Sequence, residues 1–453
     1  MMRVTCLDSF PHSLLTRHRR HLHAAFLSAV LVCSAVLCRS QNPPNAPGNQ
    51  SKPSLAETMK RVDSGETDLH IFYVHGMGIN PSKRNAGTQT FETSEEFRTS
   101  FCKMVHCTNR IEDQFEKREY AHTGPFAPNA DAPNLLFLGE QIWRDKDKTG
   151  NPSNDDWRAS APFVDHYKLV RAQGTPIHLH EINWWPLILS AKCRQIVAKE
   201  AAFIGPDDQH IKICSANTDR DGDVRFRSYQ WIISDDVEHP NPSSPGPAPF
   251  NRSQKAGVLD WGFADALLAL GPLNNYLVRG IREIVMDTYV EAAGAGAAPC
   301  DNQEFVVVSH SLGSYLMFSA LDLPSDARDA EIPDWKQNLD NLLGKTSHAY
   351  FMANQIRLLE LANLDKSSKG NLITHLKAWS DFRARCRLTA RIDAFSDPSD
   401  WLTWQVPLNA QVTVINHSVK NAPHWFWYFE NPATAHLNYD KNKHVLRAML
   451  PKD

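Results

Sequence analysis

The residue best placed to do covalent chemistry is Ser311, which lies in the pentapeptide Ser-His-Ser-Leu-Gly at residues 309–313. This pentapeptide directly follows the apolar run 305–308 and precedes a helical pattern. The spacing predicts a buried parallel strand that turns sharply into a helix, with the serine at the apex. A serine hydroxyl becomes a nucleophile when a neighbouring base takes its proton. The alternative is a buried strand that merely precedes a serine-rich helix start.

The side chains around Ser311 are as small as a tight turn requires. Residues two before and two after the apex crowd each other, and Ser309 and Gly313 occupy these positions. Because a helix would begin at the turn, we expect the free N–H of Leu312 to point at an oxyanion formed on a substrate carbonyl. His310, between Ser309 and Ser311, would line the binding site.

A glycine-flanked loop, HGMG at residues 75–78, follows an earlier short apolar strand predicted at 70–74. A backbone without Cβ atoms can approach an acyl oxygen closely, so such a loop suits a second oxyanion donor. We expect the N–H of Met77 to be that donor. The other residues of the loop, which would shape the binding site, are His75, Gly76 and Gly78.

A carboxylate that could orient a histidine lies late in the chain. A strand predicted at 388–395 ends in the loop SDPSDWL at 396–402. Asp400 precedes an aromatic and aliphatic pair that can pack and fix this loop, so we favour Asp400 over Asp397 as the acid. Asp397 would then cap the turn.

Four histidines follow this loop, and His436 is the best candidate for the base. It lies in AHLNY at 435–439, on a predicted loop ahead of a terminal helix at about 441–449. From such a loop an imidazole can reach between a serine and an acid. The runner-up is His417, directly after a strand predicted at 411–416, and the other two are His424 and His444.

Further periodic segments complete an α/β pattern. We predict a helix within 91–107 and a strand at 176–182 that leads into a helix at about 187–203. A long helical pattern at 261–293 is interrupted by the Gly-Pro pair at 271 and 272. The fold class is therefore α/β, with a mostly parallel central sheet flanked by helices.

Two tryptophans, Trp184 and Trp185, come directly after the strand predicted at 176–182. Residues at the C-terminal end of a parallel strand face the ligand side of the sheet. The pair would therefore line an acyl or aromatic pocket, or else pack in the core, which is the commoner role of buried indoles.

Taken together, the HGMG loop, the SHSLG turn, the SDPSDWL loop and the AHLNY segment resemble the α/β-hydrolase superfamily, particularly bacterial exported serine-esterase or lipase-like members. Serine, then acid, then histidine is the chain order of that superfamily. The resemblance covers residues 67 to 450, and Ser309 departs from its usual glycine. It implies hydrolysis of a carboxylic ester or related acyl bond of a small molecule or lipid, without a cofactor. An acyltransferase, an amidase or peptidase, and a non-catalytic binding protein remain as alternatives.

The N-terminal residues have the pattern of an export signal. Basic residues at 17–20 precede an apolar run at 24–38, which is short for a membrane span. We expect a signal peptide at 1–40, a disordered Pro/Asn/Ser-rich linker at 41–66 and the catalytic domain at 67–453, with insertions near 109–160 and 204–260. The mature protein would be periplasmic or secreted. Lipidation at Cys38, or an uncleaved membrane anchor, is the alternative.

Net charge and cysteine spacing indicate which binding partners, disulfides and metals to expect. A net charge of -3 and the absence of a basic stripe give no reason to expect nucleic acid, and membrane contact would come only through an uncleaved N-terminal segment. Six of nine cysteines follow residue 40, and Cys102 could pair with Cys107, with Cys193 and Cys214 as further candidates. No cysteine and histidine spacing is typical of zinc, so we expect no metal.

Overall fold

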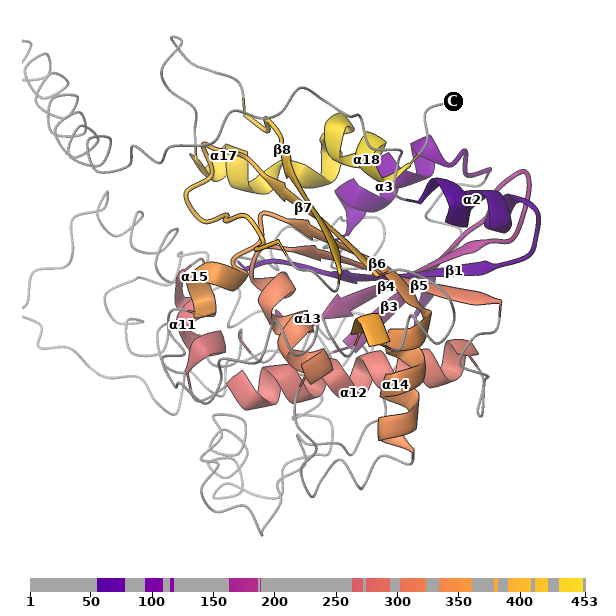
Figure 1. Ribbon diagram of the computed structural model, residues 1–453, viewed down its shortest axis with the longest axis horizontal. Coiled ribbons are helices and arrows are strands. Elements are labelled where there is room, and N and C mark those ends of the chain that lie inside the picture. Colours follow the sequence, from indigo (N-terminus) through magenta and orange to yellow (C-terminus); the bar gives the residue numbers. More distant parts are fainter. Residues whose placement is uncertain are drawn as a thin grey trace, which may run out of the picture. The chain divides into compact units, whose positions relative to one another are not determined.

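A sheet of eight strands, in the order β2-β3-β4-β1-β5-β6-β7-β8, lies at the centre of the computed structural model (Figure 1). The structure describes residues 55–77, 94–108, 115–117, 163–185, 188, 263–271, 274–293, 302–322, 334–360, 379–381, 390–408, 412–422 and 432–450. The predicted signal peptide, the insertion at 204–260, Cys193, Cys214 and most of the helix predicted at 187–203 lie outside these residues. All the described residues belong to one unit, Lys52–Asp453.

Most of the sheet is parallel. The parallel strands are β1 (Asp68–Val74), β4 (Ile177–Asn183), β5 (Gln303–His310), β6 (Thr346–Met352), β7 (Arg391–Ser396) and β8 (Thr413–Ser418). Two strands, β2 (Phe115–Lys117) and β3 (Phe163–Leu169), extend the sheet beyond β4 with antiparallel pairing. The predicted α/β class with a mostly parallel sheet is confirmed, and the arrangement is consistent with that of α/β-hydrolases.

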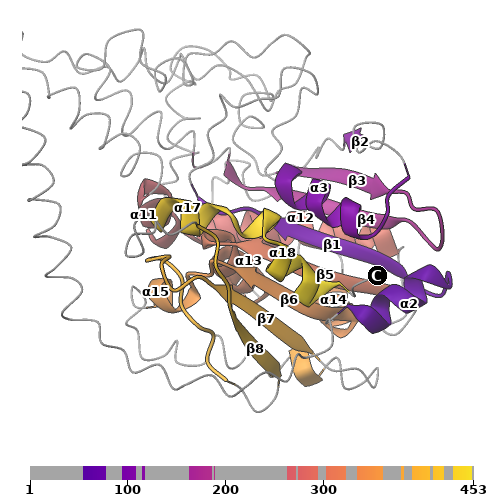
Figure 2. The ribbon, with the colours of Figure 1, turned by 90° about the horizontal axis from the view of Figure 1, so that it is seen from above.

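Helices cover both faces of the sheet (Figures 1 and 2). One face carries α11 (Ala264–Leu270), α12 (Asn274–Ala293), α13 (Leu312–Asp322), α14 (Trp335–Lys345) and α15 (Ile356–Glu360). The other carries α2 (Ala56–Asp63), α3 (Glu95–Met104), α17 (Pro432–Leu437), the 3₁₀ turn η9 (Tyr439–Lys441) and α18 (Lys443–Met449). The long helical pattern does break near residue 271, where the side-chain amide of Asn274 donates to the carbonyl of Ala269 at 2.6 Å.

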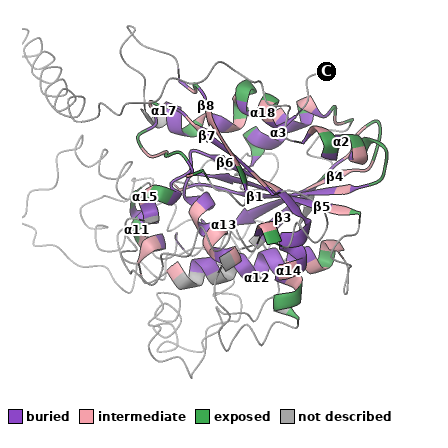
Figure 3. Ribbon diagram, in the orientation of Figure 1, coloured by how far each residue is buried: buried purple, intermediate pink, exposed green. Residues whose placement is uncertain are grey.

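Each face of the sheet has its own hydrophobic core, and the central strands β1, β5 and β6 are mostly buried (Figure 3). In β5, Phe305 and Val307 pack with α12 and α13, whereas Val306 and Val308 pack with α3 and α18. A strand covered on both faces has no polar side to alternate with, which explains the continuous apolar run before Ser311.

The expectation of a disordered linker at 41–66 is wrong for residues 55–66. There the chain forms α2. The buried apolar residues Leu55, at its N-cap, and Met59 and Val62, within the helix, are spaced as one helical face. The backbone N–H of Leu55 also donates to the carbonyl of Met449 at 2.9 Å. The helix was not predicted because the stretch at 41–66 is mostly polar, and its few apolar residues did not stand out as one face of a helix.

The sequence patterns also missed strands. Strand β2 lies within the insertion expected at 109–160 and pairs with β3, which was not predicted. Strand β6 was missed as well, although it pairs with both β5 and β7 and supplies the buried Tyr350, Phe351 and Met352.

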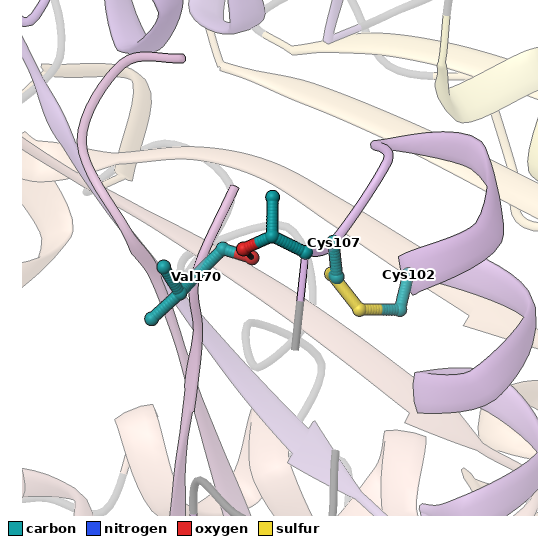
Figure 4. The surroundings of a disulfide bond; sticks show 4 residues. Cys102, Cys107 and Val170 are labelled. Carbon is teal, nitrogen blue, oxygen red and sulfur yellow. Dashed lines mark hydrogen bonds between the residues drawn. A yellow bond between two sulfur atoms is a disulfide. The ribbon is translucent and has the colours of Figure 1, made fainter. Parts of the chain in front are cut away.

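The predicted disulfide between Cys102 and Cys107 is present at the C-terminal end of α3 (Figure 4). Next to it, the backbone N–H of Thr108 donates to the carbonyl of Val170 at 2.9 Å. The disulfide therefore closes the turn after α3, and this turn is hydrogen-bonded to the chain at the end of β3.

Candidate active site

The C-terminal ends of the parallel strands bring together segments that are far apart in the sequence. Strand β1 leads into His75, β4 into Trp184, β5 into Ser311 and β7 into the loop 397–400. Because all these strands are parallel, their C-terminal ends meet at one edge of the sheet. This edge is where ligands bind in open α/β sheets.

Ser311 occupies a strained turn between β5 and α13. Its φ is +53°, a left-handed conformation that costs energy for a residue with a Cβ atom. The backbone N–H of Ser311 donates to the carbonyl of Met352 at 2.8 Å, which anchors the turn to the neighbouring strand β6. Ser309 fits the crowded position because it is fully buried and its hydroxyl donates to Ser314 Oγ at 2.9 Å.

Two glycines allow the loop after β1 to pass directly beside this turn. A Cβ atom at Gly313 would lie 2.3 Å from the carbonyl oxygen of His75, and one at Gly76 would lie 2.9 Å from the Cβ of Ser311. Neither position has room for a side chain. The loop of residues 75–77 is therefore adjacent to Ser311, as the predicted oxyanion arrangement requires.

His436 lies between Ser311 and Asp400. Its Nε2 is 2.8 Å from Ser311 Oγ. Its Nδ1 is 2.9 Å from Asp400 Oδ2 and 3.0 Å from Oδ1. A carboxylate accepts hydrogen bonds, so Nδ1 carries the proton and Nε2 is left to accept the serine hydroxyl. This is the geometry of a nucleophile, a base and an orienting acid.

The acid loop distinguishes its two aspartates. Asp400 is buried and accepts from His436, from the backbone N–H of Leu402 at 3.0 Å and from the hydroxyl of Tyr439 at 3.2 Å. Asp397 instead accepts from two backbone N–H groups, those of Ser399 at 2.8 Å and Asn421 at 2.6 Å. The structure thus brings Asp400 to the histidine and leaves Asp397 as the cap of the turn.

His436 does not lie on the loop that we expected. It belongs to the short helix α17, which precedes η9 and α18. A hydrogen bond holds the backbone of His436 in place, because the Nε2–H of His310 donates to the carbonyl oxygen of His436 at 3.0 Å. His310 is buried, and burial is the main reason that its pKa is lowered to about 3, with His436 a further cause. A neutral His310 therefore links the turn at Ser311 to α17.

His75 and Trp184 fix the loop after β1. Their rings stack with centroids 4.6 Å apart. The Nδ1–H of His75 donates to the carbonyl of Gly76 at 2.7 Å, and its Nε2 accepts from the backbone N–H of Trp184 at 3.3 Å. Burial, which outweighs the hydrogen bond to Gly76, lowers the pKa of His75 to about 3. The ring is neutral and locked in one tautomer.

The remaining predicted residues occupy varied positions. Both tryptophans are buried, and Trp184 belongs to the core of the α12 face, so the packing alternative holds for it. Met77 is partly buried against the same core, and Leu312 is the first residue of α13, where a helix has free N–H groups. Gly78 lies outside the described residues.

Of the other histidines considered as the base, the two that the structure describes, His417 and His444, lie on other elements. His417 lies on β8, and its Nε2 bonds to Asp393 Oδ1 at 2.7 Å. Asp393 is also held by Arg391, and these partners outweigh burial to keep its pKa below the usual value. His444 is exposed on α18, and His424 lies outside the described residues.

Sequence reasoning missed Tyr439, which contacts both aspartates of the acid loop. Its hydroxyl accepts from the backbone N–H of Asp397 at 2.7 Å and donates to Asp400. Local sequence gives no signal of this contact, because Tyr439 and Asp400 are 39 residues apart in the chain.

No family model, no curated protein and no solved structure matches the chain. Among the described residues there is no group of three or more histidine, cysteine, aspartate or glutamate side chains arranged to hold a metal ion. None of the described helices is both long enough and apolar enough to cross a membrane.

Proposed function

We propose that the chain is a serine hydrolase of the α/β-hydrolase superfamily that cleaves a carboxylic ester or a related acyl bond. The observation that carries the proposal is the imidazole of His436, which is in hydrogen-bond contact with Ser311 Oγ on one side and with Asp400 on the other. The strained turn at Ser311 and the loop beside it are further support, since both are costly features typical of active sites.

The mechanism follows from the direction of these hydrogen bonds. His436 Nε2 takes the hydroxyl proton as Ser311 Oγ attacks the substrate carbonyl, and Asp400 stabilises the imidazolium that forms. His436 then donates this proton to the leaving alcohol as the ester bond breaks, giving an acyl-serine. A water molecule, deprotonated by the same imidazole, attacks the acyl group and releases a carboxylic acid and the free serine.

Two backbone N–H groups would stabilise the oxyanion in both steps. Leu312 offers the first because it begins α13, where the N–H has no partner within the helix and the helix dipole favours negative charge. Met77 offers the second from the loop that passes beside Ser311. Removal of one such donor typically lowers kcat by about a hundredfold or more.

The chemistry uses only side chains and backbone of this chain, so the proposal includes no cofactor or metal. The partner is a small-molecule or lipid acyl ester. We also propose that the mature protein is exported, and the disulfide between Cys102 and Cys107 supports this, since disulfides persist in oxidising compartments.

Reaction with a fluorophosphonate followed by peptide mapping tests the proposal. We expect labelling of Ser311 in the wild type, none in Ser311→Ala and at least a hundredfold slower labelling in His436→Gln. The matched control is His444→Gln, which changes an exposed histidine in the same C-terminal region and should label at the wild-type rate. Well-folded wild-type protein that is not labelled would refute the hydrolase and favour a non-catalytic binding protein.

A panel of acyl esters would then define the substrate. Product analysis in water, with and without an added alcohol, separates hydrolysis from acyl transfer, because a transferase would deliver the acyl group to the alcohol in preference to water.

A further inference from the structure

Tyr439 bonds to Asp400, the acid of the proposed triad, from outside the acid loop. The side chain is completely buried, and its hydroxyl donates to Asp400 Oδ2 at 3.2 Å while accepting from the backbone N–H of Asp397 at 2.7 Å. One hydroxyl thus bonds to the start of the acid loop and to the acid itself.

The hydrogen bonds on Asp400 divide its two oxygens. Oδ1 accepts from the backbone N–H of Leu402 at 3.0 Å, and Oδ2 accepts from Tyr439. His436 Nδ1 lies within 3.0 Å of both oxygens. With a donor on each oxygen, the plane of the carboxylate cannot rotate away from the imidazole without breaking a hydrogen bond in a buried site, which is costly.

Tyr439 is also built to remain a donor. Burial and the negative charge of Asp400 raise the pKa of its hydroxyl far above the ordinary value, so the proton stays on the phenol across the working pH range. The ring is fixed as well, since it packs edge-on against His310 with centroids 6.0 Å apart.

We propose that Tyr439 is a positioning residue for the hydrolase reaction: its hydroxyl holds the carboxylate of Asp400 in the orientation that aligns His436 with Ser311. Residues 436–439 therefore supply both the base, His436, and the hydroxyl that holds the acid in place, that of Tyr439. This inference rests on the proposed function, because it assigns Tyr439 a task only if Asp400 and His436 act on Ser311.

Tyr439→Phe removes the hydroxyl and keeps the ring. We expect kcat to fall about tenfold with KM changed less than twofold, because the lost interaction serves alignment and not substrate binding. A carboxylate with one donor fewer attracts the imidazolium more strongly, so the acidic limb of the kcat/KM profile should move to higher pH.

The matched control is Tyr73→Phe. Tyr73 is another buried tyrosine of the same core, and its hydroxyl donates to a carboxylate, Asp440 Oδ2, at 3.0 Å. Loss of that hydrogen bond should lower the Tm by a similar amount while kcat and the pH profile stay at wild-type values. The comparison separates positioning from a merely structural contribution.

Several outcomes are decisive. If the wild type labels at Ser311 but Tyr439→Phe has an unchanged kcat and pH profile, the positioning role is wrong and the hydrolase proposal stands. If folded wild type does not label at all, the proposed function itself fails. Should Tyr439→Phe not fold, 3-fluorotyrosine at position 439 keeps ring and hydroxyl but makes the donor stronger, and the acidic limb should then move to lower pH. An unmoved limb in that protein overturns the inference.

Discussion

At the scale of single residues, Gly313 is the position at which the site tolerates a side chain least. A Cβ atom there would meet the backbone carbonyl oxygens of His75 at 2.3 Å and of Val74 at 2.6 Å. Neither atom is the end of a flexible side chain. Any substitution must therefore push the loop after β1 away from Ser311.

We expect Gly313→Ala to destabilise the fold by about 1–3 kcal/mol, the usual cost of overpacking, and to lower the rate of fluorophosphonate labelling at least tenfold. Urea unfolding and labelling kinetics would measure the two effects. Gly65→Ala is the control, because a Cβ at Gly65 has open space and its only penalty is a φ of +78° in the turn before β1, at the opposite end of that strand from His75. Labelling of Gly313→Ala at the control's rate would contradict the argument.

The individual site residues could be predicted to the extent that local sequence determines their role. The turn at Ser311 is encoded within nine neighbouring residues. The strand, the serine at the apex and the start of the helix could therefore all be predicted from local sequence. The choice of Asp400 over Asp397 depended on a packing guess, and the structure provides the actual reason, which is that Asp397 is occupied by the backbone N–H groups of Ser399 and Asn421. Contacts such as that of Tyr439 join segments 39 residues apart and have no local signature.

At the scale of elements, the disulfide between Cys102 and Cys107 ties the C-terminal end of α3 to the short turn that follows it. The turn continues into the hydrogen bond from Thr108 to Val170 and into a single bridge between Cys107 and Arg171. Buried Phe97 and Phe101 of α3 pack in the core beside Tyr73. The end of α3 is therefore fixed both covalently and by packing.

Replacing both cysteines by serine should lower the free energy of unfolding by about 2 kcal/mol, the chain-entropy value for so short a loop. Denaturant unfolding with and without a reducing agent would measure this. The wild type should lose stability on reduction, whereas the Cys102→Ser, Cys107→Ser protein should be insensitive to the reductant. Equal stability of oxidised and reduced wild type would show that packing alone holds α3.

Elements were predictable where one face or both faces of a segment are uniformly apolar. Strands β1 and β5 satisfy this, and so do the two halves of the helical pattern that become α11 and α12. Helix α2 was missed because only three buried side chains mark its apolar face within a polar stretch. Strands β2 and β3, the antiparallel pair at one end of the sheet, owe their conformation to their pairing partners, which composition alone does not reveal.

At the scale of the whole molecule, the buried groups His75, His310 and Asp440 make stability depend on pH between about pH 3 and 7. His75 and His310 have pKa values lowered to about 3, mainly by burial, so their neutral forms are favoured in the folded state. Each therefore contributes stability above the unfolded value near 6.5, which is lost as the pH falls towards 3. Asp440 behaves in the opposite way, because burial raises its pKa to about 7 and its contribution is lost as the pH rises from about 4 through 7.

We expect the Tm to be highest near pH 6.5. Below this pH the two histidines together outweigh Asp440 and the Tm falls, whereas above it only Asp440 lowers the Tm, up to about pH 7. Each histidine adds a slope of up to about 1.4 kcal/mol per pH unit below 6.5. Asp440→Asn, which removes the charge, should raise the Tm at pH 8 and leave it nearly unchanged at pH 4. Thermal melts from pH 3.5 to 9 would test this, and an Asp440→Asn curve parallel to the wild type would exclude Asp440 as the cause of the alkaline limb.

The order of the strands has a consequence for biosynthesis. The serine turn follows β5, but the histidine that would activate it comes 125 residues later, after β6, β7 and β8 have been made. While the chain is still emerging from the ribosome or threading through a secretion channel, Ser311 has no base and the enzyme we propose is silent. Activity would begin only when α17 packs against the complete sheet and His436 reaches Ser311. Completion of folding would then be the step that activates the proposed enzyme.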